Sequence, residues 1–258
     1  MAFVGNDVVD RGDPANLGKS RDARFLDKVF HREEQEFIRS SADPDGALWV
    51  LWAVKEAAWK AAVKAAPESE RGWKGIRIRL GRECPEPPGG MPDCRMLPEK
   101  EGSHGPPWEA ARTGVAETFA GPVSFEVRQR GDCIHAVGLL GPSERILWQA
   151  GLMSARGGLI YCLNILLDLA DGEAVIHRAL GPQGLLPPRL CIRGEPSGID
   201  ISLSHDGRFA AWALRTPPVI LCCGRAGDRT GSRDPVDNRN VRTFRPMMAS
   251  SPLPPVVL

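Results

Sequence analysis

The chain has 258 residues, of which 42% are hydrophobic and 25% are charged, and its formal net charge is +1. This length suits one large domain or two small ones, and the near-neutral charge gives no reason to expect nonspecific nucleic-acid binding. No apolar run approaches the roughly 20 residues that a membrane-spanning helix needs, and the N-terminal residues do not follow the pattern of a secretory signal. We therefore expect a cytoplasmic protein without a membrane or nucleic-acid partner.

Seven cysteines are spread over the chain, and none of them forms a C-x-x-C pair. This spacing argues against a zinc ribbon and against a thioredoxin-like motif. We expect reduced thiols, as is usual in the cytosol.

The first part of the chain predicts a strand, two helices and a second strand. Short β-branched and apolar residues predict a strand over residues 2–9. A helix is predicted over residues 20–41, and Asp43-Pro44-Asp45-Gly46 separates it from a second helix that is rich in tryptophan. Residues 73–80 alternate apolar and basic side chains, which is typical of a half-exposed strand. Residues 84–108 are rich in Pro and Gly and predict a loop or linker.

Regular structure is expected again in the second part of the chain. Paired strands are predicted around Arg130-Gly131-Asp132, and an amphipathic helix over residues 153–170. Residues 199–214 alternate apolar and polar side chains, and Asp206-Gly207 in their middle is a strong signal for a two-residue hairpin turn. Most of the tail from residue 216 is predicted to be disordered because it has few large apolar side chains.

These elements predict an α+β fold with two lobes, each with a small antiparallel sheet and a long packed helix. The N-terminal lobe is expected over residues 1–83 and the C-terminal lobe over residues 113–215. Residues 84–112 form the predicted linker, and residues 216–258 form the tail. No clean repeat is visible in the sequence, so a duplication of one lobe is only a hypothesis.

Glu56 is the most informative residue, because it places a charge on the apolar face of the tryptophan-rich helix. Trp52, Glu56 and Trp59 recur at steps of three or four residues and therefore share one face. An unpaired carboxylate on a buried face is costly, so a metal ion, a fixed cation or a ligand should compensate it. An ion pair with Lys60, four residues further on, is the alternative.

Asp7 and two lysines extend this hypothesis. Two carboxylates from different elements, completed by water and phosphate oxygens, are a typical Mg²⁺ arrangement, and we expect Asp7 and Glu56 to form one. Lys55 and Lys60 flank Glu56 and can hold phosphate as point charges. A turn or capping role for Asp7 and a solvated helix face for the lysines are the alternatives.

Ser204-His205 lies at the predicted hairpin corner, where a hydroxyl, an imidazole and backbone N–H groups can meet a ligand. Neighbouring side chains on a strand point to opposite faces, and the chain has no G-x-S-x-G elbow, so no hydrolase triad is indicated. The glycine-rich phosphate loops of nucleotide-binding proteins are absent as well.

A cluster of basic residues accompanies the first predicted helix. An acidic protein partner is the functional interpretation, but a solvated helix face interrupted by Asp22 and Asp27 is favoured. The members of this basic cluster are Lys19, Arg21, Arg24, Lys28 and Arg32.

Taken in order, the motifs resemble those of the 4′-phosphopantetheinyl transferases. Asp7 followed by Lys55-Glu56-Ala57-x-x-Lys60 is the specific part of the resemblance. Each motif alone is weak, but all of them in this order are strong together. The matching segments are Gly5-Asn6-Asp7-Val8-Val9-Asp10, Phe25-x-x-Lys28-Val29-Phe30 with Glu34, Trp52-x-x-Lys55-Glu56-Ala57-x-x-Lys60-Ala61 and Ser202-Leu203-Ser204-His205-Asp206-Gly207.

The resemblance implies an enzyme that transfers the phosphopantetheine arm of coenzyme A to a serine of an apo carrier protein and releases 3′,5′-ADP. It implies Mg²⁺ held by Asp7, Glu56 and the pyrophosphate. Glu56, or a water that it orients, would take the serine proton, while metal and lysine charges offset the charge that develops on the pyrophosphate.

The resemblance also assigns the rest of the ligand. Lys60, and with it Lys55, would lie near the coenzyme A phosphates. The corner at Ser204 and His205 would hold the 3′-phosphate and the nucleotide end of coenzyme A.

The motif order is that of the short, trimeric acyl-carrier-protein synthases, but this chain is about double their length. We therefore expect the site to lie between two lobes of one polypeptide, in a monomer that acts as a pseudo-dimer. Val9 stands where many longer members have a second acid, and Asn6 replaces the usual apolar residue. A non-catalytic relative that binds carrier proteins and a metal-dependent phosphohydrolase are the alternative functions.

Overall fold

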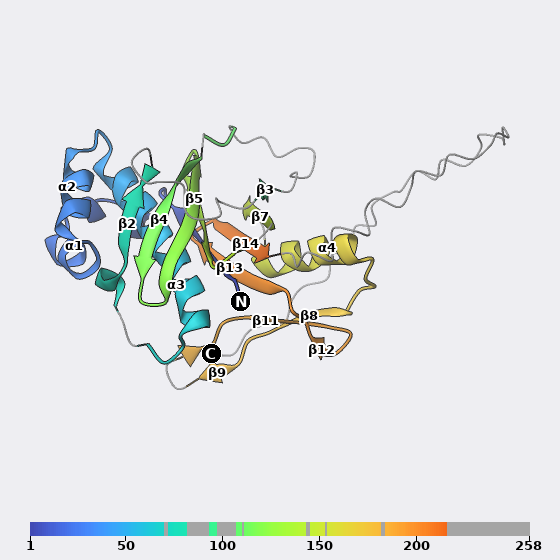
Figure 1. Cartoon of the computed structure of the whole chain (residues 1–258). Helices are drawn as coiled ribbons and strands as arrows, with labels where there is room; N and C mark the ends of the chain where they lie inside the picture. The colour runs from blue at the N-terminus through green and yellow to red at the C-terminus, as the bar shows by residue number, and fades with distance from the viewer. Residues whose placement is uncertain are drawn as a thin grey trace, which may run out of the picture. The chain divides into compact units, whose positions relative to one another are not determined.

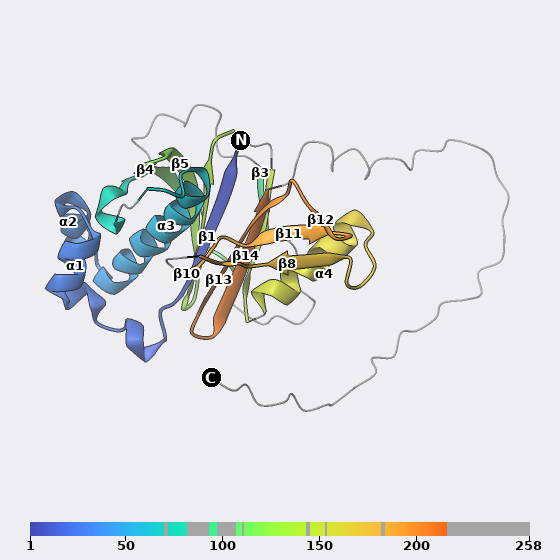
Figure 2. The same ribbon diagram turned by 90° about the horizontal axis from the view of Figure 1, so that it is seen from below.

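Strand β1 (Phe3–Asp10) is buried along almost its whole length, because it packs against other elements on both of its faces. Figure 2 shows it between helix α3 (Pro44–Ala65) and strand β13 (Asp200–Asp206). These elements belong to a computed structural model. The residues that it describes are 1–69, 72–81, 93–96, 107–109, 111–142, 145–152, 154–181 and 184–215.

The first sheet has five strands in the order β1-β6-β5-β4-β2, and all neighbours in it are antiparallel. Helix α3 covers one face of this sheet and closes the largest hydrophobic core against it. The strands that join β1 are β2 (Arg77–Leu80), β4 (Arg112–Thr118), β5 (Gly121–Arg130) and β6 (Cys133–Leu140).

Two short helices precede α3, where the sequence predicted one helix over residues 20–41. Helix α1 (Ala23–Val29) ends at Phe30, whose backbone is extended, and α2 (Arg32–Ser40) begins two residues later. Each helix has its own cap, because the Asp22 carboxylate accepts from the backbone N–H of Phe25 and Glu34 completes a capping box at the start of α2. The prediction of one continuous helix is therefore wrong.

The second sheet repeats part of the order of the first. Strand β7 (Arg145–Gly151) precedes α4 (Ala155–Leu167) as β1 precedes α3, and it pairs with β14 (Phe209–Arg215), the second strand of a hairpin, as β1 pairs with β6. A further strand, β3 (Asp93–Met96), pairs in parallel with β7. The remaining short strands of this region are β8 (Ala174–His177), β9 (Leu180–Gly181), β10 (Gly184–Leu185), β11 (Arg189–Ile192) and β12 (Glu195–Pro196).

The prediction of an α+β fold with antiparallel sheets is confirmed. The strands between residues 112 and 140, which were expected in the C-terminal lobe, belong to the sheet of β1 and β2 instead. Strand β3 lies inside the predicted linker, most of which falls outside the described residues, as does the predicted disordered tail. Contacts group Met1–Leu221 into one compact unit.

A helix that crosses a membrane needs about 20 predominantly apolar residues. Among the helices that the structure describes, none has a stretch that is both long enough and apolar enough to cross a membrane. The longest of them, α3, carries Lys55, Glu56, Lys60 and Lys64 along its second half.

Gly5 allows β1 to lie close to α3, and it provides a test of this packing. A Cβ atom at Gly5 would lie 1.9 Å from the backbone oxygen of Ala57. We expect Gly5→Ala to lower the free energy of unfolding by about 1–3 kcal/mol or more, because strand and helix must move apart. Urea denaturation measures the change.

Gly72→Ala is the matched control for this prediction. Its backbone φ is −69°, which suits any residue, and a Cβ there meets nothing within 4 Å. Equal stabilities of the two variants would contradict the close packing of β1 on α3.

Candidate active site

Lys60 connects helix α3 to strand β1. Its ammonium donates to the Oδ1 atom of Asp7 over 2.8 Å and to the backbone oxygen of Asn6 over 3.0 Å. Glu56 lies one helical turn before Lys60, on the same side of α3. Asp7 is buried and Glu56 is half-buried. The structure therefore brings together the predicted residues Asp7, Glu56 and Lys60.

The two carboxyl groups are held in an environment that opposes their ionisation. Burial raises the pKa of Glu56 to about 7, the charge of Asp7 adds to this shift, and Lys60 opposes it. Burial likewise raises the pKa of Asp7, against the attraction of Lys60. Among the described residues, Glu56 has no ion-pair partner, so the alternative of an ion pair with Lys60 is not realised. A bound cation would favour the charged form of both groups.

Strand β13 lies along β1 and is bound to it in the middle by Asn6. The backbone N–H of Asn6 donates to the Ser202 hydroxyl over 2.9 Å, and its side-chain amide donates to the Ser204 hydroxyl over 3.0 Å. All three residues are buried. The second half of the chain is thereby positioned directly beside Asp7.

Ion pairs anchor β13 at both ends. Lys64 of α3 pairs with Asp200 over 3.0 Å at the start of the strand. At its far end, Arg208 pairs with buried Asp10 over 2.6 Å and with Asp132, which lies in the turn between β5 and β6. Hydrogen bonds from Arg208 lower the pKa of Asp10 to about 2. These contacts were missed in the sequence, because their partners lie far apart along the chain.

Ser204 and His205 point to opposite faces of β13. Ser204 is 6% exposed and its hydroxyl faces β1, so its predicted role as a phosphate ligand competes with its bond to Asn6. His205 is exposed, on the side of β13 where Ile201 and Leu203 enter the core of the second sheet. At this corner the imidazole of His205 is therefore exposed to solvent, while the neighbouring Ser204 is buried between β13 and β1.

Asp206 is a residue that the sequence did not identify as functional, because it was assigned to the hairpin turn. The two turn residues are in fact Gly207 and Arg208, since Asp206 pairs with Phe209 as part of the hairpin ladder. Asp206 accepts from the backbone N–H of Asp10 over 2.8 Å, and its charge raises the pKa of Asp7 further. A second carboxylate besides Glu56 therefore lies near enough to Asp7 to oppose its ionisation.

Lys55 does not join this group, and its predicted contact with coenzyme A phosphates needs correction. Its side chain has no exposed surface, and its ammonium lies 2.9 Å from the Glu34 carboxylate. It also donates to the backbone oxygen of Ile76. Lys55 therefore neutralises a buried charge between α3, α2 and the start of β2.

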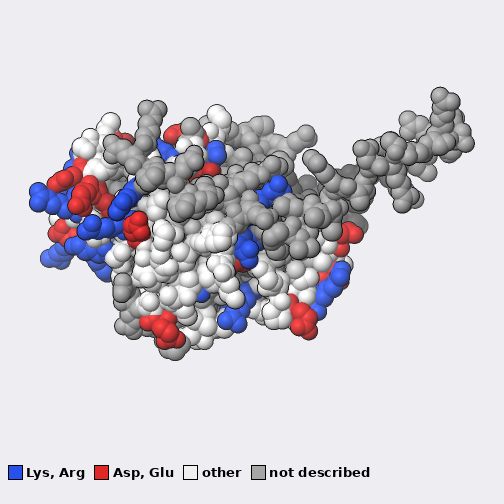
Figure 3. All heavy atoms as spheres, viewed as in Figure 1, with Lys and Arg blue, Asp and Glu red and all other residues white. Residues whose placement is uncertain are grey.

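The basic cluster around α1 lies on a surface of mixed charge. Figure 3 shows Lys and Arg side chains alternating with Asp and Glu over the part of this face where α1 and α2 lie. Lys19 lies 3.8 Å from Asp22, and Arg32 lies 2.9 Å from Glu36. The interpretation as a solvated face is therefore favoured over a docking surface for an acidic protein partner.

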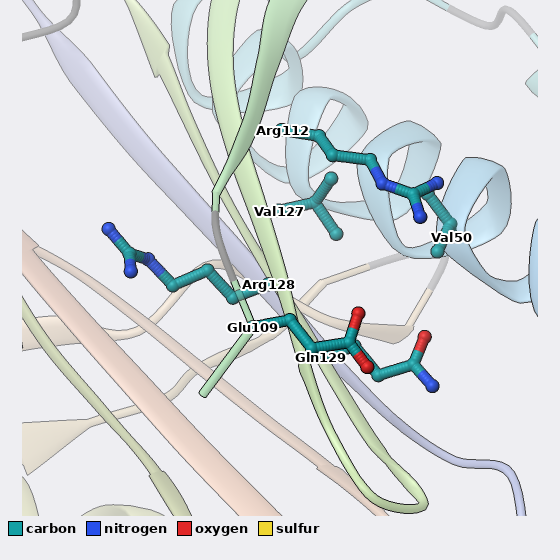
Figure 4. A pocket seen from close by; sticks show the side chains of 6 residues that line it. All are labelled: Val50, Glu109, Arg112, Val127, Arg128 and Gln129. Carbon is teal, nitrogen blue, oxygen red and sulfur yellow. The ribbon is translucent and has the colours of Figure 1, made fainter. Parts of the chain in front are cut away.

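A shallow hollow elsewhere on the first sheet includes none of the predicted site residues. It is lined by Val50, Glu109, Arg112, Val127, Arg128 and Gln129. In Figure 4, Arg112 extends toward Val50, whereas Arg128 points away from it, where it pairs with Glu126. The hollow is thus separate from the carboxylate pair.

The second lobe does not repeat the carboxylate pair. Gln149 of β7 pairs with the fourth residue of β14, as Asp7 pairs with the fourth residue of β6. Gln149 therefore stands at the position equivalent to Asp7. Helix α4 contains no acidic residue at all. Of the two strand–helix pairs compared, β1 with α3 and β7 with α4, the first has carboxylates at these positions.

Comparisons with known proteins agree with this arrangement of motifs. Residues 3–101 match the family described as the 4′-phosphopantetheinyl transferase superfamily. A holo-[acyl-carrier-protein] synthase of Chlamydia muridarum is 33% identical over 86 residues, which cover 33% of this chain and 68% of the relative. One from Chlamydia caviae is 31% identical over 85 residues, covering 33% and 69%.

The chain belongs to the 4′-phosphopantetheinyl transferase superfamily. It is an enzyme, a 4′-phosphopantetheinyl transferase, so the resemblance seen in its motifs is confirmed. The family match contains Asp7, Glu56 and Lys60 but ends before β13. The position of β13 beside β1 is therefore known from the structure and not from the family match.

The raised pKa of Glu56 predicts a pH-dependent effect of Glu56→Gln in the absence of metal. A carboxyl group whose pKa rises from 4.5 to about 7 on folding binds more protons when folded, so stability falls as the pH rises between these values. The variant lacks this loss. The free energy of unfolding of the variant minus that of the wild type should therefore be more positive at pH 8 than at pH 5. Urea denaturation at the two pH values measures this difference.

Glu195→Gln is the control, because Glu195 is exposed on β12. The Glu195→Gln variant should differ from the wild type in free energy of unfolding by the same amount at pH 5 and at pH 8. If Glu56→Gln behaves in the same way as this control, the carboxylate is not held in the environment described.

Proposed function

We propose that the chain transfers the 4′-phosphopantetheine arm of coenzyme A to a serine of an apo acyl or peptidyl carrier protein, with release of 3′,5′-ADP. The observation that carries the proposal is the convergence of Asp7, Glu56 and Lys60 beside β13. The relatives named holo-[acyl-carrier-protein] synthases support a carrier protein as the acceptor.

The donor set at this site fits Mg²⁺. Asp7 and Glu56 are oxygen ligands on different elements, and repulsion between them disfavours the ionised pair without a cation. The described residues contain no ready group of three metal-binding side chains, which suits an ion that keeps water and takes substrate phosphate oxygens. When bound, Mg²⁺ would neutralise charge on the pyrophosphate of coenzyme A.

Two residues of the chain bind the pyrophosphate and accept the serine proton. Lys60, held between Asp7 and the backbone of β1, presents its ammonium to a pyrophosphate oxygen and stabilises the leaving 3′,5′-ADP. Glu56, or a water that it orients, takes the proton from the carrier serine. The serine oxygen attacks the β-phosphorus, and the bond to the ADP oxygen breaks.

The nucleotide end of coenzyme A is assigned to the corner of β13 and β14. His205 is exposed there, so its ring nitrogens can reach a phosphate. Ser204 holds this corner against β1 through Asn6. Because β1 and β13 belong to the same polypeptide, we propose a monomer that builds its site between two halves of one chain.

The proposal is tested by incubating the protein with coenzyme A, Mg²⁺ and several apo carrier proteins. Mass spectrometry should show a gain of one phosphopantetheine arm on a carrier serine. Glu56→Gln should reduce the rate by at least about 100-fold, because it removes a metal ligand and base. Glu195→Gln, the exposed control, should retain full activity.

Other outcomes identify the alternative functions. Carrier binding without any Mg²⁺-dependent transfer would indicate a non-catalytic relative. Release of phosphopantetheine or phosphate without a carrier would indicate a phosphohydrolase. Either result contradicts the proposed transfer.

A further inference from the structure

Asn6 is a wholly buried polar residue with bonds to both halves of the candidate site. Its backbone oxygen accepts from Lys60, which also holds Asp7. Its side-chain amide donates to the Ser204 hydroxyl over 3.0 Å. One residue thus connects the carboxylate group on β1 and α3 with the corner formed by Ser204 and His205.

His135 of β6 contacts the side-chain amide of Asn6. Its Nε2 atom lies 3.4 Å from the amide nitrogen of Asn6, and its ring packs against Trp148 of β7 with centroids 4.7 Å apart. Burial, with a smaller effect from Lys60, lowers the pKa of His135 to about 3. The imidazole is therefore neutral and can accept the second amide hydrogen at Nε2.

The buried amide of Asn6 has a feature that lowers stability, an unpaired polar atom. The Oδ1 atom of Asn6 is buried and has no partner among the described residues. Turning the amide around would bring the oxygen to Ser204 and leave the nitrogen unpaired, so one polar atom stays unsatisfied either way. An unsatisfied buried polar atom costs free energy that an apolar side chain of similar size avoids.

We propose that Asn6 is a positioning residue, which fixes the Ser204 and His205 corner in register with Asp7 and Lys60. The inference rests on the proposed function, because the corner is taken to hold the nucleotide end of coenzyme A while Lys60 meets its pyrophosphate. Both ends of one ligand must be bound at a set separation. The bonds of Asn6 to Lys60 and Ser204 set that separation.

The test compares Asn6→Leu with the wild type in two measurements. Calorimetric titration with coenzyme A and Mg²⁺, without a carrier, should show binding weakened about five- to tenfold, the effect of losing one or two positioned hydrogen bonds. Urea denaturation should show a folded protein with a somewhat lower midpoint, because the buried Ser204 hydroxyl and the His135 ring lose their partner. In turnover assays, KM for coenzyme A should rise, while kcat at saturation and KM for the carrier stay within about twofold.

Two further variants separate positioning from simple structural support. Ser204→Ala removes the acceptor, so Asn6→Leu should have little additional effect on coenzyme A binding in that background. Asn164→Leu makes the same chemical change on α4, away from the interface, and should leave binding unchanged. If Asn6→Leu does not fold, Asn6→Ala, which removes the same amide, takes its place in this comparison and must raise the dissociation constant for the inference to stand.

The failures are distinguishable. Wild-type protein that does not bind coenzyme A would overturn the proposed function together with this inference. Wild-type binding with an unchanged affinity in Asn6→Leu would overturn the inference alone. A loss of affinity that adds fully to that of Ser204→Ala would show that Asn6 does not act through Ser204 and would overturn the inference as well.

Discussion

The packing of β13 on β1 is the constraint on which the candidate site depends. Asn6 binds two serines of β13 in the middle of the strand, while Lys64 and Arg208 pair with carboxylates at its two ends. Because β1 is buried on both faces, it can bind α3 on one side and β13 on the other. Residues separated by almost 200 positions thereby meet at one place.

The same constraint explains why the site carries unfavourable charge. Asp7 of β1 faces Glu56 of α3, and Asp206 approaches from β13. Asp7 is therefore opposed by the charge of Asp206 and raises the pKa of Glu56, while Lys60 favours the charged form of both Asp7 and Glu56. Such an arrangement costs stability in the free protein and gains it when a cation and a phosphate-containing ligand bind. It is common for functional sites to be strained in this way.

The sequence predicted the local parts of this structure and missed the parts that depend on distant contacts. Helical periodicity and the family motifs placed Glu56 and Lys60 on one side of α3. Lys55 was assigned to the same site, but adjacent helical residues point about 100° apart, so it reaches Glu34 in the interior. The ion pairs of Arg208 with Asp10 and of Lys64 with Asp200 join residues far apart in the sequence. No local sequence pattern predicts such pairs, and the fold reveals them.

The central claim is that one chain supplies both sides of the site, and mixing two inactive variants tests it most directly. Glu56→Gln damages the first half, and His205→Ala damages the second. If the site forms within one polypeptide, a mixture of the two proteins stays as inactive in carrier modification as either protein alone. Restored activity in the mixture would contradict the account, because it would require β1 of one molecule to meet β13 of another.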